Sequence, residues 1–273
     1  MKNGIHFISG MPRSGSTLLS ALLRQNPRIH AAMTSPVGGL VNSMLRAMSQ
    51  ENETAIFIED EQRERILRGI VDGFYADLHP SKLIFDTNRG WTSKLALLTR
   101  LFPEAKVICC VRSPAWVLDS LETLARGNPL EPSGIYKWNT VSNVYSRAEQ
   151  VMSGDGMVGH PLHCLREAVF DPRRSRLLLV RYESLTREPV QTLGAIYDFI
   201  GEAPFAHDPE TIEQDWDAIQ FDGRLGAPGL HTVGSRVRST PRPTLLPPDL
   251  FHKYDGEAFW ERKKEMPEDV RVL

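Results

Sequence analysis

The sequence feature that most constrains this chain is a glycine-bounded run near its start, residues 7–17. Its apolar beginning predicts a buried strand that ends at Gly10, followed by a short loop. A helix with an apolar face is expected from about Gly15 to Gln25. The spacing from Gly10 through Gly15 to Thr17 matches the pattern G-x-x-x-x-G-x-[ST], in which backbone amides hold a phosphate.

The loop departs from the usual phosphate-binding pattern at one position. Ser16 stands where a nucleotide triphosphatase carries lysine, and Arg13 is the one cation in the loop. An ATP-dependent kinase would require that lysine together with a magnesium site, so Ser16 argues against a kinase. The helix start supplies unpaired N–H groups and a partial positive charge, which favour an oxyanion. The alternative is a serine-rich turn that only caps a helix.

Composition narrows the function classes. The chain has 273 residues, enough for one large domain over residues 1–273, and its 41% hydrophobic and 24% charged residues are typical of a globular protein. A formal charge of −2 argues against a general nucleic-acid binder. The three cysteines have no zinc spacing, and we expect no metal. No signal peptide and no membrane-spanning apolar run are visible, which predicts a cytoplasmic protein.

Strand-like apolar runs alternate with helical patterns along most of the chain. This order predicts an α/β fold of the P-loop type, with a parallel sheet flanked by helices on both faces. Strands are expected at residues 5–9, 82–86, 105–111 and 176–180. Helices are expected at residues 15–25, from 35–36 onward, and at 59–78, 91–101, 113–126 and 186–200, with less regular helical stretches at 135–153 and 160–170. From about residue 201 we expect mostly irregular structure, with one short helix near 209–219.

A second anion site is predicted at the end of the strand at residues 105–111. Arg112 follows that strand directly, and Ser120 lies eight residues further on. Ligands gather outside the carboxyl ends of parallel strands, so Arg112 and Arg13 should meet at one edge of the sheet. Two phosphate pockets would suit a nucleotide phosphorylated at two places. The alternative for Ser120 is a structural serine that bonds its own helix.

Two later segments carry further polar groups. Arg181, Tyr182 and Glu183 follow the strand at residues 176–180, where they either contact a ligand or cap the strand. The run at residues 231–242 is basic and contains glycine and proline. Such a loop can fold over an anionic ligand, or it can simply be solvated. Its arginines are Arg236, Arg238 and Arg242.

These motifs, in this order, resemble the sulfotransferases that use 3′-phosphoadenosine 5′-phosphosulfate (PAPS). The loop at residues 12–17 is similar to the 5′-phosphosulfate loop of these enzymes. Arg112 and Ser120 are similar to their 3′-phosphate site, and residues 180–185 are similar to a segment that borders the nucleotide. The resemblance covers about residues 5–200 and is closest to the tyrosylprotein-sulfotransferase-like branch and its bacterial relatives. It implies transfer of a sulfuryl group from PAPS to a hydroxyl acceptor. The acceptor is a phenol, with tyrosine as one option, or an alcohol, on a small molecule or a peptide.

The resemblance also implies roles for individual residues. Arg13 would contact the phosphosulfate and stabilise charge on the bridging oxygen, so that magnesium is not required. The residues that would bind the 5′-phosphate are Ser14, Gly15, Ser16 and Thr17. Those that would hold the rest of the nucleotide are Arg112 and Ser120 at the 3′-phosphate, Tyr182, and Ser235 and Arg236 from the late loop.

The chain departs from the branch at its general base. The glutamate expected after the first helix is absent from residues 31–36, and Asn88-Arg89 replaces a Lys-Asp pair. A hydroxyl acceptor still has to lose a proton, and we place Asp86 as the candidate base because it ends a predicted strand. His30 and Glu122 are weaker candidates, and a structural role is the alternative for each of the three.

The missing glutamate leaves a second function open, a catalytically inactive regulator that binds PAPS or its product. The acceptor pocket is expected from residues 31–45 and 135–153, which contain no recognisable specificity pattern. A homodimer is compatible with the sequence.

Overall fold

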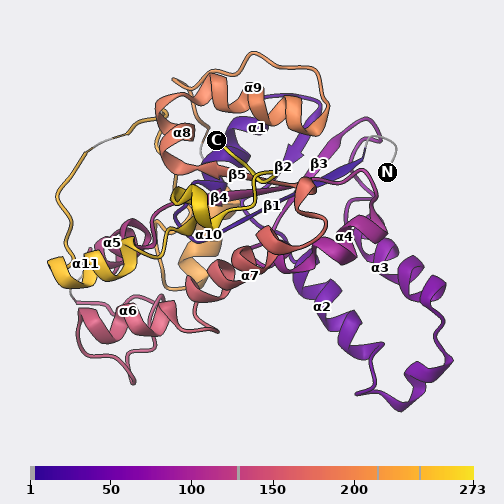
Figure 1. Ribbon diagram of the computed structural model, residues 1–273, viewed down its shortest axis with the longest axis horizontal. Coiled ribbons are helices and arrows are strands. Elements are labelled where there is room, and N and C mark those ends of the chain that lie inside the picture. The colour runs from indigo at the N-terminus through magenta and orange to yellow at the C-terminus, as the bar shows by residue number, and fades with distance from the viewer. Residues whose placement is uncertain (1–3, 128–129, 214, 240) are drawn as a thin grey trace.

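A computed structural model describes residues 4–127, 130–213, 215–239 and 241–273 (Figure 1). Its centre is a six-stranded parallel sheet in the order β2-β3-β1-β4-β5-β6. The strands are β1 (Ile5–Gly10), β2 (Ile29–Ala31), β3 (Leu83–Thr87), β4 (Val107–Val111), β5 (Leu177–Arg181) and β6 (Arg271–Val272). The predicted α/β class with a parallel sheet is therefore confirmed.

Helices surround the sheet. They are α1 (Ser16–Leu23), α2 (Val37–Ala47), α3 (Asp60–Phe74), α4 (Leu95–Leu101), α5 (Pro114–Ala125), α6 (Val144–Met152), α7 (Gly159–Phe170), α8 (Tyr182–Arg187), α9 (Pro189–Ile200), α10 (Trp216–Arg224) and α11 (Pro248–Asp255). Short 3-10 turns lie at Glu53–Phe57, Trp91–Lys94, Arg174–Arg176, Phe259–Glu261 and Lys263–Glu265.

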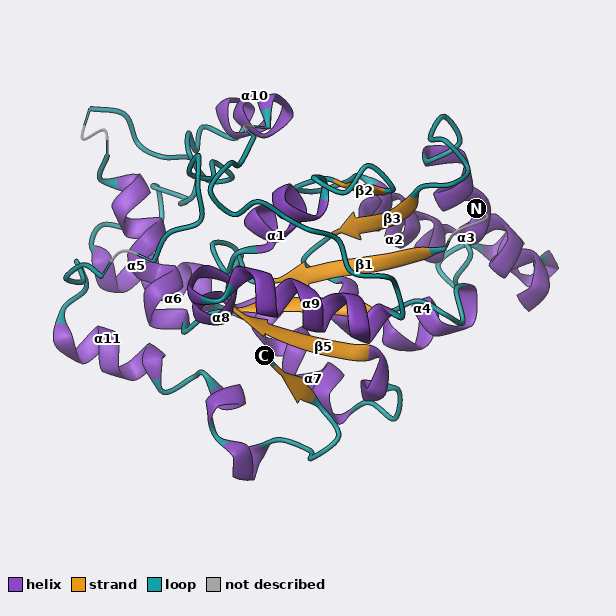
Figure 2. Ribbon diagram, turned by 90° about the horizontal axis from the view of Figure 1, so that it is seen from above, coloured by secondary structure: helices purple, strands orange, loops and turns teal. Residues whose placement is uncertain are grey.

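The sheet is buried on both faces because successive residues of each central strand enter different cores. In β1, Phe7 joins the core formed with α4, α5 and α7, whereas Ile8 joins the core formed with α1 and α9. In β4, Val107 belongs to the first of these cores and Ile108 to the second. Figures 1 and 2 show α1 and α9 on one side of the sheet and α7 on the other. Continuous apolar strands are what a sheet covered on both sides requires.

Two predicted helices are divided in the structure. The predicted helix at residues 91–101 begins as the 3-10 turn Trp91–Lys94 and becomes α4 only at Leu95. The predicted helix at residues 186–200 is α8 followed by α9, because Pro189 cannot continue the hydrogen bonding of α8 and instead occupies the first turn of α9.

The part of the chain after residue 201 is more regular than expected. The helix predicted near residues 209–219 is α10 and lies later, at Trp216–Arg224. Helix α11 packs against α5, where the Phe251 and Trp116 rings meet edge to face at 5.2 Å between centroids. The two-residue strand β6 pairs with β5, a contact too short to leave a periodic signal in the sequence.

The strand order places a topological switch point at β1. The chain goes from β1 through β2 to β3 on one side of β1, and β4 to β6 lie on the other side. Ligands of open parallel sheets bind in the crevice at such a point, outside the carboxyl ends of the strands. The loop at residues 11–15 follows β1 and so occupies this position.

Candidate active site

The loop after β1 adopts a backbone shape that depends on its glycines. Gly10 has a φ of 139°, and a Cβ there would lie 2.3 Å from the carbonyl oxygen of Cys110 in β4. Gly15 has a φ of 101° and precedes α1. A Cβ at Gly15 would lie 3.2 Å from the ring of Tyr182. Arg13 has a φ of 58°, the one positive φ of a non-glycine residue in the described ranges. Such backbone strain concentrates at functional loops.

The side chain of Arg13 is held at the centre of the site. Its Nε donates a hydrogen bond to Ser120 Oγ at 3.1 Å, and its Nη1 donates to the carbonyl oxygens of Gly229, at 3.1 Å, and Leu230. Burial, together with the nearby Arg112 guanidinium, lowers the pKa of Arg13. The guanidinium therefore links the first loop to a segment more than 200 residues away.

Arg112 lies beside Arg13 with donor capacity to spare. Its guanidinium stacks over the ring of Tyr182 at 4.2 Å from the centroid, and its Nη1 donates to the carbonyl oxygen of Arg13 at 3.3 Å. Its Nε is buried without a hydrogen-bond partner in the described part of the chain. A buried donor without an acceptor is rare and marks a position where a ligand fits.

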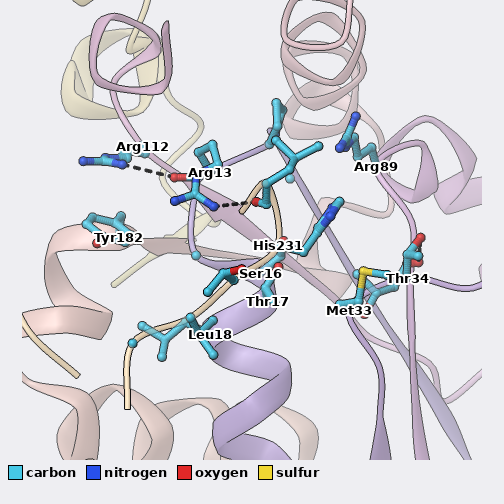
Figure 3. Close-up of a pocket in the computed structure, with 18 of the residues that line it drawn as sticks. Arg13, Ser16, Thr17, Leu18, Met33, Thr34, Arg89, Arg112, Tyr182 and His231 are labelled. Atoms are coloured by element: carbon cyan, nitrogen blue, oxygen red, sulfur yellow. Dashed lines mark hydrogen bonds between the residues drawn. The ribbon is translucent and has the colours of Figure 1, made fainter. Parts of the chain in front are cut away.

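These groups face one cavity of about 840 Å³, which lies within the range of small-molecule sites (Figure 3). The sequence-predicted residues that line it are Arg13, Gly15, Ser16, Thr17, Arg112, Tyr182, Ser235 and Arg236. Ser14 and Ser120 are not among the lining residues, since Ser14 Oγ donates to the carbonyl of Met11 at 2.6 Å and Ser120 accepts from Arg13. Arg13 and Arg112 thus share one cavity, and the structure does not separate the two expected phosphate pockets.

Asp86 does not line this cavity. It is fully buried, and it accepts hydrogen bonds from Ser35 Oγ at 2.5 Å, Tyr75 OH at 2.6 Å and Trp91 Nε1 at 2.7 Å. Burial raises the pKa of Asp86, although the three hydrogen bonds oppose the rise. This geometry is that of a carboxyl group that joins structural elements, and it gives no support to the prediction that Asp86 is the base.

The two weaker candidates lie outside the cavity as well. Glu122 is buried between Arg126 and Arg147, whose hydrogen bonds hold its pKa low even though burial acts to raise it. His30 packs edge to face on Tyr75, with 5.5 Å between ring centroids, and burial lowers its pKa. Neither residue is among those that line the cavity.

The cavity contains a histidine that the sequence reasoning did not consider as a base. His231 Nδ1 lies 2.6 Å from Asp222 Oδ1, and the His231 backbone N–H donates to Asp222 Oδ2 at 2.7 Å. Asp222 is only 1% exposed. Burial lowers the pKa of His231, while the Asp222 hydrogen bond opposes this shift. A neutral imidazole that donates from Nδ1 to the carboxylate keeps its lone pair on Nε2.

Residues 221–238 form the wall of the cavity that carries His231. This wall includes part of the basic run at residues 231–242. Arg236 and Arg238 line the cavity, but Arg242 pairs with buried Asp119 of α5 and so anchors the loop instead. Of residues 31–45 and 135–153, which were expected to shape an acceptor pocket, only a few line this cavity. Met33 and Thr34 line the cavity, none of residues 135–153 does, and Met157, Phe221 and Leu225 contribute in their place.

No helix in the described residues is both long and apolar enough to cross a bilayer. No three metal-ligating side chains of the His, Cys, Asp or Glu type gather there as a group.

Fold and site together define an α/β protein with a cationic, glycine-bounded loop at the switch point of a parallel sheet. A sequence model described as the sulfotransferase family matches residues 6–206. The chain therefore belongs to the sulfotransferase family.

Known proteins agree with this assignment. Protein-tyrosine sulfotransferase 2 of Gallus gallus is 24% identical over 240 residues, which cover 86% of this chain and 58% of that protein, so the chain spans little more than half the length of this relative. The crystal structure of mouse sulfotransferase SULT7A1 complexed with PAP superposes with a TM-score of 0.53 at 15% identity, covering 97% of this chain and 86% of that one. The second likeness shows a common fold.

Proposed function

We propose that this protein transfers a sulfuryl group from PAPS to a hydroxyl acceptor, with His231 as the general base. The observation that carries the proposal is one cavity in which Arg13, Arg112 and the His231–Asp222 pair meet. The PAP ligand of the mouse structure supports a nucleotide of this kind as the donor. The start of α1 supplies backbone N–H groups to a phosphate, and the free Nε of Arg112 supplies a donor to a second one.

The residues divide the chemistry between them. His231 Nε2 accepts the proton of the acceptor hydroxyl while the acceptor oxygen forms its bond to sulfur. The bond from sulfur to the bridging oxygen breaks, and its electron pair stays on that oxygen as the 5′-phosphate of PAP. Arg13 stabilises the charge that develops there as a fixed, preorganised donor. Asp222 fixes the orientation and tautomer of the imidazole.

The His231–Asp222 pair also bears on the alternative of an inactive regulator. The sequence leaves that alternative open because the expected glutamate is absent from residues 31–36. A carboxylate-oriented histidine beside the donor cations supplies the missing function, so the site favours an enzyme. Arg13 and Arg112 should then act on different steps.

The test is an assay with ³⁵S-labelled PAPS and a panel of phenols, alcohols and tyrosine peptides. Arg13→Ala should lower kcat by about 10²–10³-fold, the usual effect of removing one preorganised donor. Arg112→Ala should weaken the binding of PAP by about 10–100-fold, since a hydrogen bond to a charged group contributes about 1.5–3 kcal/mol. Arg46→Ala is the matched control because Arg46 is exposed and its side chain pairs with exposed Glu51.

Three outcomes would contradict the proposal. PAP binding without transfer to any acceptor would favour the regulator. Magnesium-dependent ATP turnover would indicate a kinase. An unchanged PAP affinity in Arg112→Ala would remove the assignment of Arg112 to the nucleotide.

A further inference from the structure

The cavity continues beyond His231, away from the cations assigned to the donor. In Figure 3, Arg112 and Tyr182 lie to one side of His231, and Arg89, Met33 and Thr34 lie to the other. The cavity as a whole also has apolar lining residues that the donor assignment does not use. They are Met33, Met157, Phe221 and Leu225.

Arg89 differs from the other arginines of the cavity. Arg13 is held by three acceptors, Arg112 stacks on Tyr182, and Arg236 pairs with Glu210. Arg238 is exposed to solvent. The partly buried guanidinium of Arg89 makes no hydrogen bond or ion pair within the described ranges, and burial alone lowers its pKa. A partly desolvated cation without a counter-ion is unfavourable, so this position is suited to an anion.

The position of Arg89 assigns that anion to the acceptor. Arg89 and Arg13 both act to lower the pKa of His231, with Arg89 the stronger of the two. Arg112 acts on the pKa of Arg13, whereas Arg89 is not among the charges that do so. Figure 3 shows Arg89 on the side of His231 that is opposite to Arg112 and Tyr182.

We infer that the acceptor is a small hydroxy acid with an apolar body, whose carboxylate binds Arg89. The inference rests on the proposed function and specifies its acceptor. The apolar side chains of the same cavity would hold the carbon frame, and His231 would meet the hydroxyl. One cavity of about 840 Å³ has to hold the donor together with the part of the acceptor that carries the hydroxyl, which favours a small acceptor. A guanidinium binds a carboxylate through two parallel hydrogen bonds, which fixes its orientation.

The experiment compares acids with their methyl esters as acceptors, using para-hydroxyphenylacetate for a phenol and ω-hydroxyhexanoate for an alcohol. The wild-type enzyme should prefer the acid by about 10–100-fold in kcat/KM, because a charge-assisted hydrogen bond contributes about 1.5–3 kcal/mol. Arg89→Gln should bring this ratio close to one by raising KM for the acid only, and Arg89→Lys should retain part of it. Arg46→Gln should leave the ratio unchanged.

A second readout does not depend on turnover. Titration of para-hydroxyphenylacetate into the protein–PAP complex should show binding to the wild type and a loss of about 10-fold or more in Arg89→Gln. PAP affinity should be unchanged in that variant, which shows that the fold and the donor site are intact.

The outcomes separate this inference from the function on which it rests. Equal use of acids and esters would overturn the inference and leave sulfuryl transfer standing. An equal fall of kcat for acid and ester in Arg89→Gln would place Arg89 on the sulfuryl group and would also overturn it. Sulfation of acidic tyrosine peptides but not of the free acids would overturn the small-molecule acceptor. Binding of the acid without any transfer would refute the proposed function while supporting the carboxylate site.

Discussion

At the scale of single residues, the site combines groups that the sequence motifs predicted with one pair that they did not. Arg13, Ser16, Thr17 and Arg112 lie along the cavity where strand ends meet. In the sequence, His231 stands out only as the first residue of the basic run at residues 231–242. Its proposed role as a base depends on Asp222, which lies in α10 nine residues earlier. A pair that joins a helix to the loop after it gives no periodic signal in the sequence.

The His231–Asp222 pair leads to a prediction about pH. Burial lowers the pKa of His231 below its ordinary value of about 6.5, so the neutral base should persist at neutral pH. The value of kcat/KM should be level above this pKa and should fall as pH drops through it. Asp222→Asn should lower kcat for alcohol acceptors by about 10²-fold or more, in the range of general-base contributions.

Acceptors of different acidity show whether His231 acts as a base or has a structural role. A strongly acidic phenol such as para-nitrophenol needs little help in losing its proton, so Asp222→Asn and His231→Gln should lose much less activity with it. An equal loss with alcohols and para-nitrophenol, or a pH profile without an acidic limb, would contradict this assignment of the base.

At the scale of elements, the loop after β1 depends on how closely β1 approaches β4. The absent Cβ of Gly10 allows this approach, because that atom would lie 2.3 Å from the Cys110 carbonyl oxygen. Gly10→Ala should therefore lower the free energy of unfolding by at least about 1–3 kcal/mol, the cost of a strained backbone position. PAP affinity should fall with it, since the loop would move.

Gly69 of α3 provides the matched control. A Cβ at Gly69 meets nothing within 4 Å, so Gly69→Ala should raise the free energy of unfolding by up to about 1 kcal/mol through helix propensity. Urea unfolding followed by circular dichroism measures both variants. If Gly10→Ala were as stable as the wild type, the close approach of β1 and β4 would be disproved.

At the scale of the whole molecule, Asp86 joins elements that are distant in sequence. Its partners are Ser35 before α2, Tyr75 after α3, and Trp91 in the 3-10 turn before α4. Asp86→Ala would leave the buried Trp91 N–H and Tyr75 hydroxyl without an acceptor, at about 1–3 kcal/mol each. The melting temperature should fall clearly. The kcat of the folded fraction, counted by PAP titration, should change only a few-fold.

The opposite result would restore Asp86 as the base. An Asp86→Ala protein that melts like the wild type but loses about 10²-fold or more in kcat would fit a general base. It would also contradict the assignment to His231.

The architecture and the glycine-bounded loop after β1 could both be predicted from the sequence. Apolar strands alternating with helical patterns require a parallel sheet covered on both faces, and glycines at fixed spacing dictate a local backbone shape. Both are local properties of a short run of residues. The tertiary structure decided which polar side chains face the cavity. It buried Asp86 among three hydrogen-bond donors and brought Asp222 against His231. It also left Arg89 without a counter-ion among the described residues. Such choices depend on contacts between segments far apart in the chain, and no local pattern encodes them.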